Sequence, residues 1–183
     1  MKKEIRIDEL RVMMLDALTL RGIGSEDADF IVDDFLDAEL EGHKTHGVSK
    51  FLTLDIGLSG RESGIEIVRQ TDGHAKIDGH RELGHIAARQ AAAFSVELAK
   101  EYGVGLVALT NVSRYARLVP YSRLIAERGC IGIVTNNGGP AHVVPFGGSA
   151  PMFGTNPLSF GFPQGEKPPL LFDFATAQGV WGE

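Results

Sequence analysis

Two stretches near the N-terminus carry apolar residues at helical spacing. The first lies within residues 7 to 22, where Asp8 is placed to cap its start and the apolar positions repeat with the i, i+3, i+4, i+7 period. The second starts at Ser25 and keeps this period through Leu40. Glycines separate the two stretches, so the pattern predicts a helical hairpin. The expected apolar face of the first helix consists of Leu10, Met13, Met14, Ala17 and Leu18.

The pattern changes after a third helical stretch, which runs through Phe51 and Leu58. Residues 65–68 alternate like a strand, and residues 75–78 are typical of its hairpin partner. The elements expected after this hairpin are an alanine-rich helix over 85–101, a helix over 121–128, and strands over 104–109, 131–135, 158–162 and 170–174.

Helices mixed with short strands predict a fold of the α+β class. We expect an N-terminal helical domain over residues 1–62, followed by a layered α/β domain over residues 63–183.

Composition and charge narrow the class of partner. The chain is 43% hydrophobic and 23% charged, as in soluble globular proteins. Its 24 acidic and 18 basic residues give a net charge of −6 without a basic block, so a nucleic-acid partner is not expected. No apolar run approaches the ~20 residues that span a bilayer, and the N-terminus lacks a signal-peptide core. We therefore expect small-molecule partners, no membrane and a cytoplasmic location.

Side chains that could act as nucleophiles give little support to a hydrolase. Cys130 is the only cysteine, which excludes an internal disulfide, and its apolar neighbours Ile131 and Ile133 predict that it is buried. Neither Ser113 nor Ser159 lies in a nucleophile elbow or has a convincing base partner.

Two motifs resemble binding sites but lack their context. His43 and His46 stand three apart, but no third ligand motif accompanies them and flanking glycines favour a turn, so we predict no metal site. Residues 103–108 fit the G-x-G-x-x-A dinucleotide fingerprint. That fingerprint must follow a strand and open a helix, whereas here a helix precedes it and a strand follows. The segment is therefore interpreted as a helix-to-strand turn.

The long loop over residues 136–157 is rich in glycine, proline and asparagine. Loops of this length are usually functional, and spaced glycines allow a backbone to approach a ligand closely. An ordered Ω-like connection without a ligand is the alternative, and composition leaves both interpretations open.

Four motifs, in this order, resemble the malate/L-lactate dehydrogenase family, which is distinct from the familiar Rossmann-type enzymes. The resemblance covers nearly the whole chain, and that family includes malate, sulfolactate and ureidoglycolate dehydrogenases, diketogulonate reductase and cyclic imino acid reductases. The motifs are Thr45-His46-Gly47-Val48, the loop with Asn136-Asn137 and Pro145-Phe146-Gly147-Gly148, then Gly154-Thr155-Asn156-Pro157, and Asp173-Phe174-Ala175-Thr176.

The resemblance implies an NAD- or NADP-dependent oxidoreductase, built as a homodimer, whose α/β domain binds the cofactor without a Rossmann fold. Hydride would pass between nicotinamide and a small 2-oxo or 2-hydroxy acid, or a cyclic imino acid. His46 would be the proton donor, a role that suits an imidazole with an ordinary pKa near ~6.5.

The resemblance also assigns binding roles. Lys50 stands where the family usually has a carboxylate-binding arginine, and Arg114 stands where many members have a second histidine. Arg114 could bind the carboxylate instead, or lie on a surface turn. The substrate-binding residues expected are Lys50, Arg114 and Asn137, and those on the cofactor side are Asn137, Gly154, Thr155, Asn156, Asp173, Phe174, Ala175 and Thr176.

Family chains are considerably longer than 183 residues. We therefore expect the chain to be truncated at its C-terminus, with part of the cofactor and substrate pocket missing. The alternative function is a non-catalytic nucleotide-binding or interaction remnant of this family, in which the missing half leaves apolar surface exposed.

Overall fold

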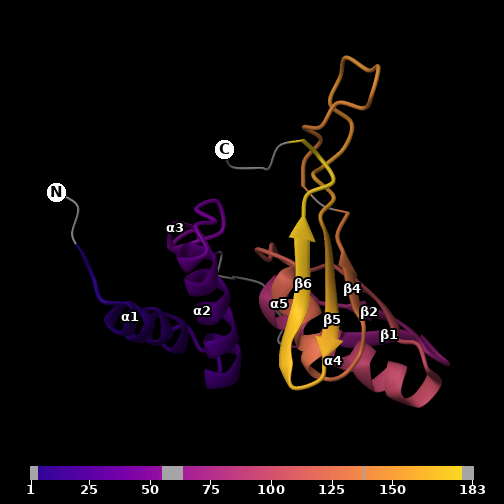
Figure 1. Cartoon of the computed structure of the whole chain (residues 1–183), viewed down its shortest axis with the longest axis horizontal. Coiled ribbons are helices and arrows are strands. Elements are labelled where there is room, and N and C mark those ends of the chain that lie inside the picture. The colour runs from indigo at the N-terminus through magenta and orange to yellow at the C-terminus, as the bar shows by residue number, and fades with distance from the viewer. Residues whose placement is uncertain (1–3, 55–63, 138, 179–183) are drawn as a thin grey trace.

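The computed structural model describes residues 4–54, 64–137 and 139–178. Its first part is helical: α1 spans Ile7–Thr19, α2 spans Ser25–Leu40 and α3 spans Val48–Phe51. In Figure 1 these helices lie together on one side of the molecule. The predicted helical hairpin is confirmed, whereas the third helix is shorter than expected. The predicted end of that helix and the boundary between residues 62 and 63 lie outside the described residues.

The start of α1 differs from the prediction. Arg6 occupies the N-cap position, and no side chain caps the helix there. Asp8 lies instead within the first turn, where its charge interacts favourably with the positive end of the helix dipole.

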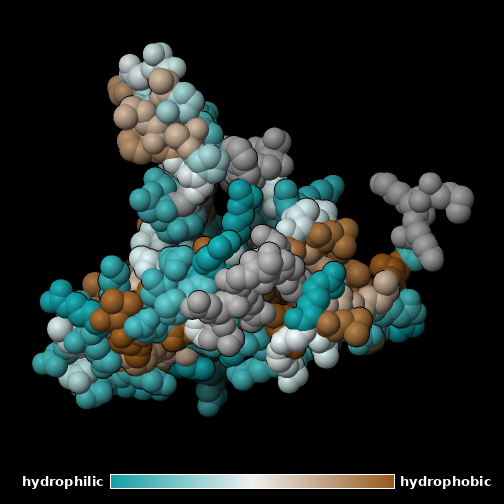
Figure 2. All heavy atoms as spheres, turned by 180° about the vertical axis from the view of Figure 1, so that it is seen from behind, coloured by the Kyte–Doolittle hydropathy of each residue, from teal (hydrophilic) through white to brown (hydrophobic). Residues whose placement is uncertain are grey.

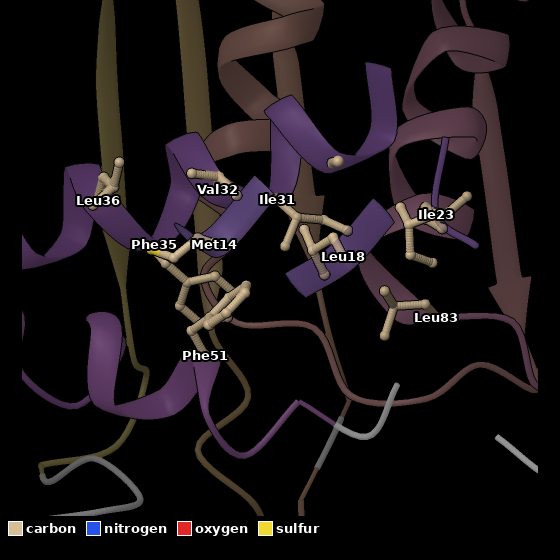
Figure 3. Packing of buried hydrophobic residues seen from close by; sticks show 11 residues of the cluster. Met14, Leu18, Ile23, Ile31, Val32, Phe35, Leu36, Phe51 and Leu83 are labelled. Carbon is tan, nitrogen blue, oxygen red and sulfur yellow. The ribbon is translucent and has the colours of Figure 1, made fainter. Parts of the chain in front are cut away.

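The helical part has its own core, shown in Figure 3. Phe35 of α2 is 2% exposed and packs edge-on against Phe51, with the ring centroids 5.7 Å apart. Of the apolar face predicted for α1, Met14 and Leu18 are buried but Met13 is 59% exposed. This part of the prediction is wrong, because α1 packs mainly against α2 and therefore buries a narrow stripe. The buried members of the core are Met14, Leu18, Ile23, Ala28, Ile31, Val32, Phe35, Leu36, Phe51, Leu83 and Ile86.

The next elements form a three-stranded sheet backed by a helix. β1 (Glu66–Thr71) pairs antiparallel with β2 (His74–Asp78), which confirms the predicted hairpin, and β2 pairs parallel with β3 (Leu106–Thr110). The helix α4 (Gly84–Tyr102) connects the two parallel strands. It ends at Gly103, whose φ of 82° places it in the left-handed region. The segment that mimics a dinucleotide fingerprint is thus the helix-to-strand turn expected.

A second sheet follows α5 (Val119–Glu127). β4 (Gly132–Thr135), β5 (Leu158–Gln164) and β6 (Lys167–Phe174) are antiparallel neighbours in that order. One face packs on α5, where Ser122 Oγ and Ser159 Oγ are 2.7 Å apart and both residues are buried. A Cβ on Gly161 would lie 2.2 Å from the Ser122 carbonyl oxygen, so the helix touches the strand backbone there. Helices and small mixed sheets make up the molecule, and the predicted α+β class is confirmed.

The other face of this second sheet is apolar and open to solvent. Ile133 is 63% exposed and Phe172 is 47% exposed. Cys130 is only half-buried and its neighbour Ile131 is 65% exposed, so the predicted burial of Cys130 is wrong. The reason is that the described helices cover the sheet on the α5 side alone. We call this surface the open face; it consists of Ile131, Ile133, Phe160, Phe162, Leu170, Phe172 and Phe174.

The loop between β4 and β5 forms an arm that extends beyond the ends of the strands (Figure 1). Val143 and Phe153 form an isolated antiparallel bridge across it, and the His142 amide donates to the Phe153 carbonyl at 2.9 Å. Phe146 at its tip is fully exposed. Figure 2 shows this arm as a projection with a partly apolar surface. Among the helices described, none is long and apolar enough to cross a membrane.

Candidate active site

His46 lies in a tight loop that joins α2 to α3. Its amide donates to the His43 carbonyl at 2.9 Å, and its Nδ1 is 3.0 Å from Thr45 Oγ1. The next turn is held by Glu39, whose Oε2 accepts the Val48 amide at 2.9 Å. A Cβ on Gly47 would lie 2.2 Å from that same oxygen, so a side chain there would displace the carboxylate. The glycine of the Thr-His-Gly motif therefore leaves room for the Glu39 carboxylate of α2 beside the loop.

The imidazole is half-buried, and its surroundings favour the neutral form. Loss of contact with water is the largest influence and lowers the pKa of His46 below its ordinary value. Asp34 and Asp173 oppose this effect, whereas Arg117 and His43 add to it. The structure thus places the predicted proton donor within electrostatic reach of Asp173, a predicted cofactor-side residue.

Asp173 stands near the end of β6 and caps a helix distant in sequence. Its Oδ2 accepts the Leu118 amide at 2.9 Å and the Val119 amide at 2.8 Å, at the N-terminus of α5. The residue as a whole is exposed, but this oxygen lies against the helix end. Desolvation raises the pKa of Asp173, against the lowering effect of the two N–H donors. The contact fixes the end of β6 against the N-terminus of α5.

Arg117 was not predicted from the sequence. It is 8% exposed and directly precedes the amides that Asp173 accepts. Its Nε donates to Asp34 Oδ1 and its Nη2 to the Asp34 carbonyl, both at 3.0 Å, while Nη1 donates to Glu41 Oε2 at 2.5 Å. Burial lowers the pKa of Arg117, but the carboxylates of Asp34 and Glu41 together outweigh this effect and raise it. The guanidinium thereby joins the start of α5 to α2 and to the residue that ends α2.

One sequence signal could have indicated this cluster. Asp34 lies three residues after Ile31 and four before Ala38, both on the buried face of α2. A carboxylate in an apolar stripe requires a buried partner. The sequence does not say which partner, because Arg117 is 83 residues away.

Asp34 also faces two buried polar side chains of other helices. Its Oδ2 is 3.6 Å from His85 Nε2, at the start of α4, and both side chains are almost fully buried. Tyr121 of α5 is 1% exposed, and burial together with Asp34 raises its pKa well above the ordinary value. Because Asp34 Oδ2 accepts no hydrogen bond from the described residues, the ion pair with Arg117 is the main compensation there for the Asp34 charge.

The two C-terminal motifs contact each other. Thr176 Oγ1 donates to the Thr155 carbonyl at 3.1 Å and to the Asn156 carbonyl at 2.9 Å. Asn156 has a φ of 42°, in the left-handed region, and its buried Oδ1 has no hydrogen-bond partner among the residues described. Gly154 and Ala175 beside this contact are half-buried. Phe174 belongs to the open face, where its ring centroid lies 6.4 Å from that of Phe160.

The predicted substrate-binding residues lie at the surface. Lys50 is exposed on α3, Arg114 is exposed in the segment before α5, and Asn137 is exposed just after β4. A cavity of about 460 Å³ lies between α2, α4 and α5, but none of the predicted site residues lines it. The candidate site is thus made up of His46, Asp173 at the end of β6 and the Thr155–Thr176 contact that follows that strand.

These observations define a class: an α+β protein in which a helical part carries a histidine loop beside the end of an antiparallel sheet. The chain belongs to the malate/L-lactate dehydrogenase family, whose family model matches residues 5–183. This confirms the family resemblance.

Individual relatives agree with this assignment. The chain is 35% identical over 175 residues to L-sulfolactate dehydrogenase from Methanocaldococcus jannaschii, an alignment that covers 93% of this chain and 50% of that protein. It is 29% identical over 185 residues to Delta(1)-pyrroline-2-carboxylate reductase 1 from Burkholderia ambifaria, with 98% and 54% covered.

A solved structure shows the same fold. Malate dehydrogenase from Entamoeba histolytica superposes with a TM-score of 0.86 at 32% identity, over 98% of this chain and 51% of that one. The chain therefore spans about half the length of the relatives it matches.

Proposed function

We propose that the protein containing this chain is an NAD- or NADP-dependent oxidoreductase. Its substrate class would be small 2-oxo and 2-hydroxy acids or cyclic imino acids, because the relatives named above act on sulfolactate, malate and pyrroline carboxylate. The observation that carries the proposal is the contact between the two C-terminal motifs, together with a half-buried histidine that is influenced by Asp173 of the second motif. A homodimeric state stays a prediction from the family resemblance, and a cytoplasmic location stays a prediction from the sequence.

His46 suits proton exchange with a substrate oxygen or nitrogen. Its lowered pKa leaves the imidazole largely neutral at pH 7, so it can accept a proton from a hydroxyl group. In the opposite direction the protonated ring would return that proton. The Thr45 hydroxyl contacts Nδ1, which leaves Nε2 for the substrate.

The cofactor side fits a neutral hydrogen-bonding ligand. The buried Oδ1 of Asn156 accepts no hydrogen bond from the described residues, and an amide N–H of the ligand would satisfy it. Bound nicotinamide would supply or accept the hydride. The residues proposed to hold it are Asn137, Gly154, Thr155, Asn156, Asp173, Phe174, Ala175 and Thr176.

Two exposed cations are proposed for the substrate carboxylate. Arg114 can donate two parallel hydrogen bonds to a carboxylate, whereas Lys50 offers a point charge. Both are free to reach a ligand because both side chains lie at the surface.

Titration with NADH and NADPH, followed by nicotinamide fluorescence, tests the cofactor site. Thr176→Val removes the hydroxyl that holds two carbonyl groups of the binding segment, so we expect affinity to weaken up to about tenfold, which corresponds to one hydrogen bond. The matched control is Thr110→Val, which also removes a hydroxyl-to-carbonyl bond, to Ile77 in the first sheet, and should bind as the parent does. A folded parent chain that binds neither nucleotide would contradict the proposal for this chain.

The open face favours a second candidate, a non-catalytic interaction remnant. A continuous apolar surface of this kind usually marks an interaction site. Turnover assays with 2-oxo acids and cyclic imino acids separate the two functions. Saturable nucleotide binding without turnover on any of them would favour the remnant.

A further inference from the structure

Arg117 connects the three parts that must keep their relative positions if His46 is to work beside the end of β6. Through Glu41 it holds the residue that ends α2 and begins the loop to His46. Through Asp34 it is anchored to the buried face of α2. The two amides that follow it in the chain bind Asp173. One buried guanidinium therefore fixes the histidine loop and the strand end to a common frame.

The charges around His46 come from four elements. Asp34 belongs to α2, Arg117 precedes α5, Asp173 belongs to β6 and His43 lies in the loop of His46 itself. Asp34 and Arg117 are buried, so water screens their charges less than it screens exposed ones. Their influence on the imidazole is opposite in sign, because one is an anion and the other a cation.

We propose that Asp34 and Arg117 are positioning residues for His46: their buried ion pair fixes the histidine loop beside the α5 N-terminus and sets the electrostatic field around the imidazole. The inference rests on the proposed role of His46 as the proton-transferring group. Neither residue touches the reacting atoms in this arrangement.

A neighbouring pair provides a matched control. Asp37 lies three residues after Asp34 on α2 and pairs with Arg123 of α5 at 2.8 Å, so it joins the same two helices. Its side chain is 37% exposed, whereas that of Asp34 is fully buried. Asp37 and Arg123 are not among the groups that mainly shift the pKa of His46. Loss of this control pair therefore removes a contact between the two helices, and we expect it to change the field at the imidazole less than loss of Asp34 does.

The experiment is an NMR titration of the histidine rings in the full chain, without cofactor or substrate. The signal of His46 is assigned with His46→Asn, and the variants are Asp34→Asn and Asp37→Asn. Removal of the Asp34 carboxylate should shift the pKa of His46 further downward, because an anion that favours the charged ring is lost. Asp37→Asn should leave the pKa of His46 unchanged.

The direction of the shift separates a direct electrostatic effect of the Asp34 carboxylate on His46 from a general loosening of the fold. If Asp34→Asn merely loosened the fold, His46 would gain water and its pKa would rise toward the ordinary value. A rise, or no change, therefore overturns the proposal. Since the titration involves no nucleotide, its outcome is independent of the cofactor-binding test above.

A second variant tests the mechanical link without removing charge. Arg117→Lys keeps a cation beside Asp34 but loses the three-way contact of the guanidinium. We expect the amide signals of residues 42–47 to shift, while the pKa of His46 stays close to that of the parent chain. Unchanged amide signals in this loop would overturn the positioning role of Arg117.

Discussion

The helical part and the second sheet differ in how far their apolar side chains are buried. In the helical part, Phe35 and Leu18 are almost inaccessible to water because three helices and the start of α4 surround them (Figure 3). In the second sheet, α5 covers one face and leaves Ile133 and Phe172 largely exposed on the other. The comparison teaches that helices which surround an apolar stripe, here with help from the start of α4, close a core, whereas a sheet needs a layer on each apolar face.

The largest effect is expected in the helical core. Phe35→Ala removes a ring that packs against Phe51 and lies 5.4 Å, centroid to centroid, from His85. A cavity in a closed core is costly, and we expect about 3–5 kcal/mol less stability. Urea unfolding followed by circular dichroism measures this value. A loss of stability below about 1 kcal/mol would contradict this expectation and would mean that neighbouring side chains fill the space of the ring.

A smaller effect on stability is expected from His46. Because the folded state lowers the pKa of His46, the unfolded chain binds more protons near pH 6. The stabilisation is fully present above the ordinary histidine pKa, near ~6.5, and is lost as pH falls through the folded value.

Unfolding free energies at pH 5 and pH 8 check this sign. His46→Asn should reduce the gain in stability between the two pH values. His74→Asn, a change at an exposed position of β2, serves as the control and should retain the gain. An unaltered pH dependence in His46→Asn would show that the imidazole is as well hydrated in the folded chain as in the unfolded one.

The smallest effect on stability is expected on the open face. Ile133→Ser changes a side chain that is 63% exposed, so the free energy of unfolding should change by about 0.5 kcal/mol or less. The same change should reduce binding of a hydrophobic dye and any self-association, because it interrupts the apolar patch. A loss of more than about 2 kcal/mol would instead show that this face is covered in solution.

Much of the fold follows from local patterns. The helical period predicted α1 and α2, alternation predicted the β1–β2 hairpin, and the misplaced glycine fingerprint was correctly interpreted as a turn at Gly103. Motif order alone led to the family, which the comparisons confirm. These features depend on residues close together in the chain, so the sequence displays them directly.

The candidate site could be predicted only in part from the sequence. Thr155, Asn156 and Thr176 were predicted to line the cofactor side; they contact one another, and their binding of the cofactor stays a prediction. Arg117 and its contact with Asp34 were missed, because a buried ion pair between residues 83 positions apart leaves no spacing pattern. The same holds for Asp173, whose motif was recognised but whose cap on α5 was not.

What the sequence determined by itself is the set of elements, their type and the family motifs, because backbone preference and periodicity act over one or two turns. What only the tertiary structure decided is which faces are covered and which charges meet. Met13 was expected inside and lies outside, and Cys130 was expected to be buried and is only half-buried, since burial depends on a second layer that no local pattern specifies. The surroundings of His46 were decided in the same way, by Asp34, Arg117 and Asp173 arriving from three distant segments.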